Sequence, residues 1–283
     1  MNIGYLFLAL NVLASVGFGH VIKVAQRNGA NLVMIGAVNY GVGAVMTAAI
    51  ALVLGAGGLT PLTMGYATVA GLSYGVSYLV YLRALPLFGV GITTTAARLT
   101  AMPAVAASIL YWGEQPSTAR LVGIVVASLA LPLLSLRTPP AQIGSSGYAW
   151  LWLSSMFLII SVTPVMAKAF EESGLAGSQP AFVAVWFAVA GVVGVIVGLY
   201  KRLRPTRDDL VIGSILGVAN GGGTLGMMFG LAWLPASVLF PVAASGSVLL
   251  AVVSGAWVWG EKLSRPALVG VLLAVAALLL VNL

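Results

Sequence analysis

Arg98 is a single cation within a run of apolar and hydroxyl residues, Thr93-Thr94-Thr95-Ala96-Ala97-Arg98. The six acidic residues all lie at the ends of apolar stretches or between them: Glu114, Glu171, Glu172, Asp208, Asp209 and Glu261. A guanidinium far from any carboxylate in this pattern could bind an anionic substrate group, such as a carboxylate or a phosphate. The alternative is a structural arginine that extends toward the membrane surface or binds carbonyls at a helix end.

Three tyrosines, Tyr74, Tyr78 and Tyr81, are spaced i, i+4 and i+7, which places them on one face of a helix. Ser77 lies beside them. Aromatic side chains facing a cavity could stack on a ring or hold a cation. The alternative is ordinary packing together with an aromatic belt at the membrane surface, which suits Tyr81 best.

Other polar or aromatic residues fall inside apolar stretches, where each needs an explanation. Asn11 has Ser15 one turn away, Asn39 precedes Tyr40, and Asn220 precedes Gly221-Gly222-Gly223-Thr224. The glycine run could interrupt a helix and expose carbonyls to a cavity, or allow close helix packing, which is the favoured alternative. The complete set of candidate substrate-binding residues is Arg98, Tyr74, Tyr78, Asn11, Asn39, Asn220, Trp186 and Ser77.

The composition identifies the medium in which these residues work. Hydrophobic residues make up 60% of the 283 residues and charged residues 7%, where a soluble domain carries roughly 25% charged residues. Mean hydropathy is +1.08. So much apolar surface predicts a lipid bilayer as the partner. The absence of cysteine and the single histidine exclude thiolate and His-rich metal sites, and we expect no cofactor.

Ten apolar stretches approach the roughly 20 residues that a helix needs to cross a membrane. They cover about 3–22, 31–54, 62–82, 88–111, 118–136, 148–169, 180–200, 209–231, 236–258 and 266–283. Leu85-Pro86 is among the predicted breaks between them. The predicted fold class is therefore an all-α membrane protein with ten transmembrane helices.

The chain shows signs of an internal repeat. Trp112-Gly113-Glu114 recurs as Trp259-Gly260-Glu261, and Leu121-Val122-Gly123 recurs as Leu268-Val269-Gly270 at the same offset. We expect two five-helix repeats, 1–140 and 141–283. Because five is odd, the second repeat would enter the membrane from the opposite side, which is typical of secondary transporters. Glu114 and Glu261 end equivalent helices and are interpreted as structural, capping or pairing locally.

Basic residues concentrate in alternate breaks. Those after the odd spans carry Lys23, Arg27, Arg83, Arg137, Lys201, Arg202, Arg204, Arg207, Lys262 and Arg265, whereas the even breaks carry Arg120 and Lys168. By the positive-inside rule the odd breaks are cytoplasmic and both termini face outward. The net charge of +7 is thus explained by orientation, and we expect no nucleic-acid partner.

The stretches 103–131 and 248–283, with their Trp-Gly-Glu and Leu-Val-Gly motifs, resemble the end of an EamA-type repeat of the drug/metabolite transporter superfamily. The resemblance covers both halves. It implies a central cavity lined by helices 1–4 and 6–9, with helices 5 and 10 outside it. Members commonly have cytoplasmic termini, which is the reverse of the charge count here.

These observations predict a secondary transporter, an exporter or facilitator, rather than an enzyme. It would move a small metabolite, an amino acid or other carboxylate-bearing compound, across the bacterial inner membrane by alternating access. The alternatives are an exporter of hydrophobic or quaternary-ammonium cations and an organophosphate exchanger. The first span lacks the glutamate that small multidrug exporters use, which disfavours proton–cation exchange. We expect a monomer or a weak homodimer.

Overall fold

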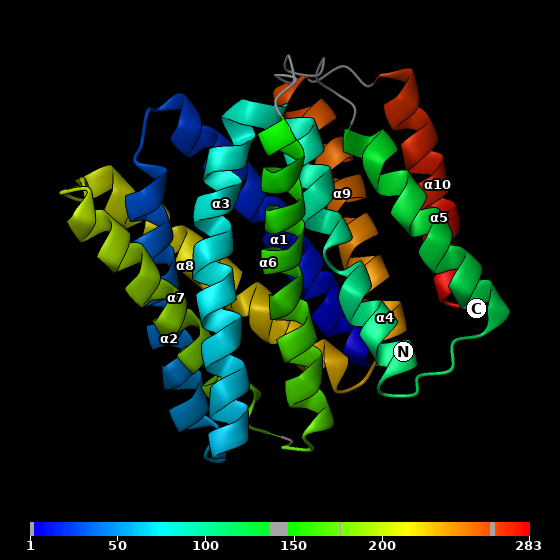
Figure 1. The fold of residues 1–283 in the computed structure, drawn as a ribbon, viewed down its shortest axis with the longest axis horizontal. Coiled ribbons are helices and arrows are strands. Elements are labelled where there is room, and N and C mark those ends of the chain that lie inside the picture. The colour runs from blue at the N-terminus through cyan, green and yellow to red at the C-terminus, as the bar shows by residue number, and fades with distance from the viewer. Residues whose placement is uncertain (1–2, 136–146, 176, 261–263) are drawn as a thin grey trace. The chain divides into compact units, whose positions relative to one another are not determined.

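The structure, a computed structural model, describes residues 3–135, 147–175, 177–260 and 264–283. These residues form α-helices and no strands. In chain order the helices are α1 (Ile3–Arg27), α2 (Leu32–Val53), α3 (Pro61–Leu99), α4 (Met102–Leu110), α5 (Thr118–Ser135), α6 (Gly147–Glu172), α7 (Gln179–Tyr200), α8 (Arg207–Leu231), α9 (Ala236–Trp259) and α10 (Arg265–Val281), as Figure 1 shows.

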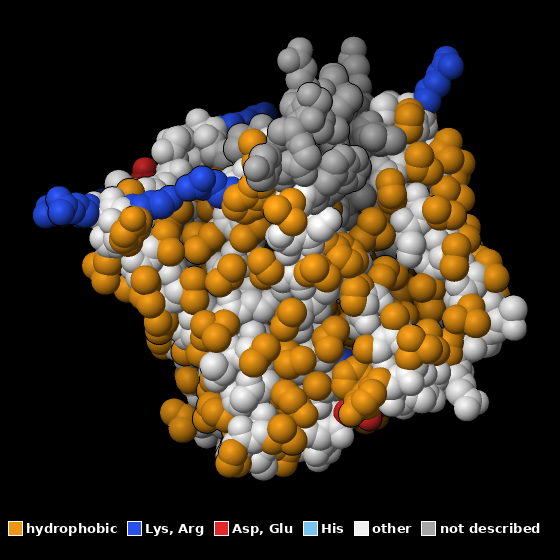
Figure 2. Space-filling view, viewed as in Figure 1, with side chains coloured by type: hydrophobic (Ala, Val, Ile, Leu, Met, Phe, Trp, Pro, Cys, Tyr) orange, Lys and Arg blue, Asp and Glu red, His pale blue; other side chains and the backbone are white. Residues whose placement is uncertain are grey.

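The described helices carry an apolar surface that is compatible with a membrane protein. Six of the described helical segments are long and apolar enough to cross a membrane: α1, α2, Ser154–Glu172 of α6, α7, α8 and α9. Large apolar side chains such as Val45, Leu129 and Leu272 are mostly exposed. In Figure 2 hydrophobic side chains cover the visible face, and Lys and Arg project at its margins. The all-α part of the prediction is confirmed, and the surface is compatible with an α-helical membrane protein.

The predicted break at Leu85-Pro86 is wrong. The structure has one helix from Pro61 to Leu99, and the next interruption lies at Thr100-Ala101. Proline removes only one backbone donor from the hydrogen-bond ladder, and helices in lipid tolerate it because the freed carbonyls find other partners. Arg98 consequently lies in the last turn of α3 and not within a separate fourth span.

The described chain divides into two compact units, and each draws on both halves of the sequence. The first unit comprises Met1–Leu79 and Met166–Trp233, and the second comprises Val80–Val165 and Leu234–Leu283. In the first unit α2 packs against α7 and α8, while α1 packs against α8. In the second unit α5 packs against α10, and α9 against α4, α5 and α10.

Glycines bring the helices of the first unit close together. A Cβ placed on Gly217 of α8 would lie 2.7 Å from the carbonyl oxygen of Asn39 on α2. A Cβ on Gly71 of α3 would lie 2.5 Å from the carbonyl oxygen of Trp186 on α7. Because both neighbours are backbone atoms, only glycine permits these approaches. Small residues at helix interfaces are the usual means of packing helices in membranes, where backbones must approach without a hydrophobic driving force.

A buried carboxylate connects the beginnings of α8 and α2. Asp209 is 0% exposed. Its Oδ1 accepts a hydrogen bond from the backbone N–H of Asn31 (2.9 Å), and its Oδ2 accepts one from the backbone N–H of Thr206 (2.9 Å). The Thr206 hydroxyl in turn accepts from the N–H of Asp209, which completes a capping box. Asn31 caps α2 through the N–H groups of Val33 and Met34. One side chain therefore ties two helix starts together.

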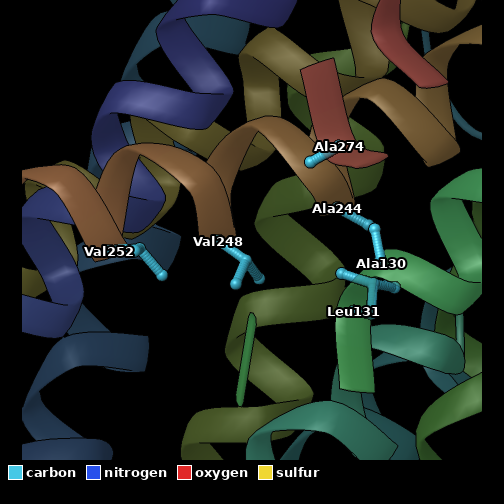
Figure 3. Close-up of a cluster of buried hydrophobic side chains, with 6 residues drawn as sticks. All are labelled: Ala130, Leu131, Ala244, Val248, Val252 and Ala274. Carbon is cyan, nitrogen blue, oxygen red and sulfur yellow. The ribbon is translucent and has the colours of Figure 1, made fainter. Parts of the chain in front are cut away.

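The second unit has an apolar core between α5, α9 and α10. Figure 3 shows its buried residues, with Ala244 of α9 facing Ala130 and Leu131 of α5; the full set is Ala130, Leu131, Ala244, Val248, Val252 and Ala274. The outer sides of α5 and α10 remain exposed, for example at Val125 and Leu279. These two helices thus pack on each other along one side and present leucine and valine on the other.

Glu114 caps a helix that is distant in the sequence. Its Oε1 accepts a hydrogen bond from the N–H of Ala236 (2.9 Å), and its Oε2 accepts one from the N–H of Ser237 (3.0 Å). Both donors open α9, whose own N-cap residue, Pro235, provides no side-chain cap. A carboxylate at this position also complements the positive end of the helix dipole. Glu114 is therefore a capping residue within the second unit. Its predicted counterpart, Glu261, lies outside the described residues.

Glu114→Gln is expected to lower the free energy of unfolding by about 1–2 kcal/mol, because the amide keeps one acceptor and turns an NH2 group toward the other N–H donor. The measurement is thermal unfolding of the purified protein in detergent. Gln115→Ala, at the exposed neighbouring position, is the matched control and should unfold like the wild type. Equal stability of the two variants would show that the cap contributes nothing.

Candidate functional site

Five aromatic side chains from three helices meet in the first unit. Tyr40 comes from α2, Tyr74 and Tyr78 from α3, and Trp186 and Phe187 from α7. We call these five residues the aromatic cluster. Ring centroids lie 5.3 Å apart for Tyr40–Tyr74, 5.4 Å for Tyr74–Trp186 and 5.9 Å for Tyr40–Phe187. Most pairs are tilted or edge-to-face, which is the arrangement that ring quadrupoles favour.

A chain of polar side chains adjoins this cluster. The Tyr74 hydroxyl donates to Oδ1 of Asn220 (3.1 Å), and Nδ2 of Asn220 donates to Oδ1 of Asn39 (3.4 Å). These three residues, which we call the polar chain, link α3, α8 and α2. Asn39 is 1% exposed. Burying amides in an apolar bundle is costly unless they are hydrogen-bonded, and here each amide finds a partner on another helix.

Trp186 contributes a donor that finds no partner among the described residues. Its side chain is 2% exposed, and its Nε1 is a buried nitrogen that makes no hydrogen bond within the described part of the chain. The indole N–H can only donate. Tyr74, Phe182 and Phe187 surround the ring at centroid distances of 5.4, 6.0 and 6.2 Å. Buried donors left unsatisfied are rare in folded proteins, so this one needs an explanation.

Three other candidate residues use their polar groups within the fold. The Tyr78 hydroxyl donates to the carbonyl oxygen of Leu32 at the start of α2 (2.8 Å). The Ser77 hydroxyl donates to the carbonyl oxygen of Tyr74 in its own helix (2.9 Å). Asn11 donates through Nδ2 to the carbonyl oxygen of Gly223 (2.8 Å), which joins α1 to α8. The contacts of Tyr78 and Asn11 therefore join helices, whereas that of Ser77 lies within α3.

The glycine run after Asn220 does not interrupt α8, which is continuous from Arg207 to Leu231. It instead allows a close approach to α1, since a Cβ on Gly223 would lie 2.8 Å from the Cβ of Ala14. The two predictions for this glycine run were an interrupted helix and close helix packing, and the structure shows close helix packing. The carbonyl oxygen of Gly223 in this run accepts the hydrogen bond from Asn11 of α1.

Arg98 belongs to the second unit, whereas the other seven candidates belong to the first. It is partly buried in the last turn of α3. A cation is stabilised there by the negative end of the helix dipole and by the carbonyls that no later turn can bond. This position gives a physical reason for the second of the two alternatives for Arg98, a structural arginine that binds carbonyls at a helix end. It does not remove the guanidinium's capacity to bind an anion.

Tyr40 and Phe187 are cluster members that the predicted site lacks. A signal for Tyr40 was present: Gly36, Tyr40, Gly43 and Thr47 repeat at i, i+4, i+7 and i+11, and all four are buried. That stripe marks the side of α2 that packs inward. Gly43 faces the Phe187 ring, so the two missed aromatics meet across the same interface. Among the described residues, no group of His, Asp and Glu could hold a metal ion.

Comparison with known proteins shows the fold but indicates no activity. No family model matches the chain. An uncharacterized protein of Haemophilus influenzae is 24% identical over 204 residues, which cover 71% of this chain and 69% of the relative. One crystallised protein superposes with a TM-score of 0.81 over 98% of both chains, at 14% sequence identity. That likeness shows that this arrangement of helices exists in a solved structure. The described residues thus form an all-α protein with six helices long and apolar enough to cross a membrane and with a buried polar and aromatic cluster.

Proposed function

We propose that this protein is a secondary transporter of a small metabolite, an amino acid or another carboxylate-bearing compound. The observation that carries the proposal is the aromatic cluster with its adjoining polar chain, held between four helices of an apolar bundle. Polar groups within membrane helices are expensive to bury and tend to mark substrate pathways. Small-molecule sites combine apolar and aromatic walls with a few placed polar groups, and this cluster has that composition.

Contacts between helices that are equivalent in the two predicted repeats support an inverted-repeat transporter. The second helices of the two halves, α2 and α7, pack together, and so do the fifth helices, α5 and α10. The helix starts show the same relation. Asn31, which caps α2, donates its N–H to Asp209 near the start of α8, and Ser178, before α7, donates to the carbonyl oxygen of Gly57 ahead of α3 (3.1 Å). Such a pair of reciprocal contacts is what a two-fold relation between repeats would produce.

The proposal is tested by counterflow in proteoliposomes that contain the purified full chain and are preloaded with a mixed panel of amino acids and organic acids. Exchange of at least one panel compound above the level of protein-free liposomes is the expected result. An absence of exchange across the panel would refute the proposed substrate class. ATP is left out of the assay because a secondary transporter needs none.

Arg98 is proposed to bind the anionic group of the substrate. Arg98→Gln is then expected to weaken transport of carboxylate-bearing compounds by about 10- to 100-fold, the range expected for losing a charged hydrogen bond. Arg98→Lys should retain part of the activity, because it keeps the charge without the bidentate geometry. Arg83→Gln, at an exposed position of the same helix, is the control. If Arg98→Gln and Arg83→Gln transport anionic compounds equally well, Arg98 does not bind the substrate and only stabilises the C-terminal end of α3.

A second candidate function is export of a quaternary ammonium or hydrophobic cation. The centroid of the Tyr74 ring lies 5.3 Å from that of Tyr40 and 5.4 Å from that of Trp186, and aromatic rings can hold such cations by cation–π attraction. Counterflow of tetraethylammonium, with no exchange of carboxylates, would favour this alternative. An organophosphate exchanger would instead exchange phosphate esters and depend on Arg98. An enzyme would need a nucleophile and base pair that the candidate residues do not provide.

We also propose the bacterial inner membrane as the location, with both termini outside, on the distribution of basic residues between the alternate breaks. A reporter fused to Leu283 that is active in the cytoplasm would refute this orientation.

A further inference from the structure

The indole N–H of Trp186 is a buried hydrogen-bond donor. Trp186 is 2% exposed, and Nε1 finds no partner among the described residues. The indole ring is also enclosed, because the rings of Tyr74, Phe182 and Phe187 lie at centroid distances of 5.4, 6.0 and 6.2 Å from it. A donor that is both buried and enclosed must stay unsatisfied until something else supplies an acceptor.

The neighbouring side chains do not supply that acceptor. Asn220 Oδ1 accepts from the Tyr74 hydroxyl and Asn39 Oδ1 accepts from Asn220, and no acceptor among the described residues is hydrogen-bonded to the indole nitrogen. The donation runs along the polar chain from Tyr74 through Asn220 to Asn39. Phe182 and Phe187 offer only ring carbon atoms. An N–H directed at a ring face is a weak interaction, and it is the alternative that the experiment must separate from binding of a ligand.

We propose that Trp186 Nε1–H donates a hydrogen bond to an acceptor oxygen of the transported substrate. The apolar part of the same substrate would pack against Tyr40, Tyr74 and Phe187, whose rings adjoin the indole. This inference rests on the proposed function and deepens it, because a site that presents a donor selects compounds with an oxygen acceptor. A quaternary ammonium cation has no acceptor and would leave the donor unpaired, which sites built around buried polar groups reject strongly.

The first test observes the donor itself. The chain has seven tryptophans, and the Trp186 resonance in a 15N–1H spectrum of the indole groups is identified by its loss in Trp186→Phe. Wild-type protein in nanodiscs is titrated separately with each amino acid or organic acid that it exchanges in counterflow, and with tetraethylammonium. We expect a downfield proton shift of the Trp186 resonance with the acids and no shift with tetraethylammonium. An equal shift with tetraethylammonium would overturn the proposal.

The second test measures the effect of the donor on affinity. Trp186→Phe retains an aromatic ring and removes the N–H, so the apparent affinity for an exchanged acid is expected to fall about tenfold. Trp257→Phe, at a side chain that is 89% exposed, is the matched control and should bind like the wild type. Thermal unfolding of both variants checks that they fold.

The two tests together separate this inference from the proposed function. Exchange of acids by the wild type, with an unmoved Trp186 resonance and unchanged affinity in Trp186→Phe, would overturn the role of Trp186 and leave the transporter intact. In that case the indole N–H faces a ring. If the wild type exchanges none of the acids, the proposed function fails, and the inference that rests on it fails with it.

Discussion

Gly71→Ala is expected to lower the free energy of unfolding by about 1–3 kcal/mol, the usual cost of inserting a methyl group into a packed interface. The new Cβ would lie 2.5 Å from the carbonyl oxygen of Trp186 and 2.7 Å from the Cβ of Val189. The first of these neighbours is backbone, which cannot rotate aside as a side chain could. Relief therefore requires α3 and α7 to separate, and both helices carry members of the aromatic cluster. Transport should fall together with stability.

Gly65→Ala is the matched control for this experiment. Gly65 lies in the same helix, and a Cβ there would meet nothing within 4 Å. Alanine is favoured over glycine in a helix by about 1 kcal/mol, so Gly65→Ala should be as stable as the wild type or more so. Thermal unfolding in detergent and counterflow are measured for both variants. If Gly71→Ala matches Gly65→Ala in both measurements, the close approach of α3 and α7 at this position is wrong.

Asp209→Asn is expected to destabilise the first unit by about 1–3 kcal/mol, the cost of leaving a buried hydrogen-bonding group unsatisfied. Both carboxylate oxygens accept backbone N–H groups, one from Asn31 and one from Thr206, at 2.9 Å each. An amide has one acceptor oxygen, so its NH2 group would face one of these donors in a site that is 0% exposed. The connection between the starts of α2 and α8 would then be lost on one side.

Asp208→Asn separates this effect from the general loss of an acidic charge near a helix start. Asp208 also lies in the first turn of α8 but is exposed. Its replacement removes only the interaction with the helix dipole, about 0.3–1 kcal/mol at an exposed site. Unfolding of the two variants in detergent, compared with wild type, gives the difference. Identical unfolding of Asp208→Asn and Asp209→Asn would mean that Asp209 acts through its charge alone.

The two carboxylates that cap helices illustrate what a sequence pattern reveals about local structure. Thr206 and Asp209 form a capping box that can be recognised within four residues of sequence. Glu114, in contrast, caps the start of α9, which is 122 positions away. The Trp-Gly-Glu motif marks Glu114 as a repeated feature, but no local pattern names its partner. Only the packing of the second unit brings the two together.

The candidate site divides in the same way. Helical spacing placed Tyr74 and Tyr78 on one face of a helix. Asn39 and Asn220 were selected because they are polar residues within apolar stretches. Tyr40 and Phe187 were not predicted as site residues, because aromatic residues are common in apolar helices. The rings that they contact lie on other helices, which the sequence pattern does not identify. The sequence also did not predict that the two tyrosine hydroxyls have different partners. The Tyr74 hydroxyl donates to Asn220 on α8, whereas the Tyr78 hydroxyl donates to a backbone carbonyl of α2.

The helical class followed from the sequence alone and is confirmed. Apolar composition and the length of the apolar stretches predict helices in lipid, because backbone groups there must be hydrogen-bonded within the segment, and the apolar surface of the described helices is compatible with that prediction. The tertiary structure decided where α3 ends and that the glycine run of α8 allows close helix packing. It also showed that the Trp186 indole N–H has no hydrogen-bond partner among the described residues. These depend on distances between helices far apart in the chain. Helical periodicity specifies the face of the helix on which a side chain lies, but not the residue on another helix that this side chain contacts.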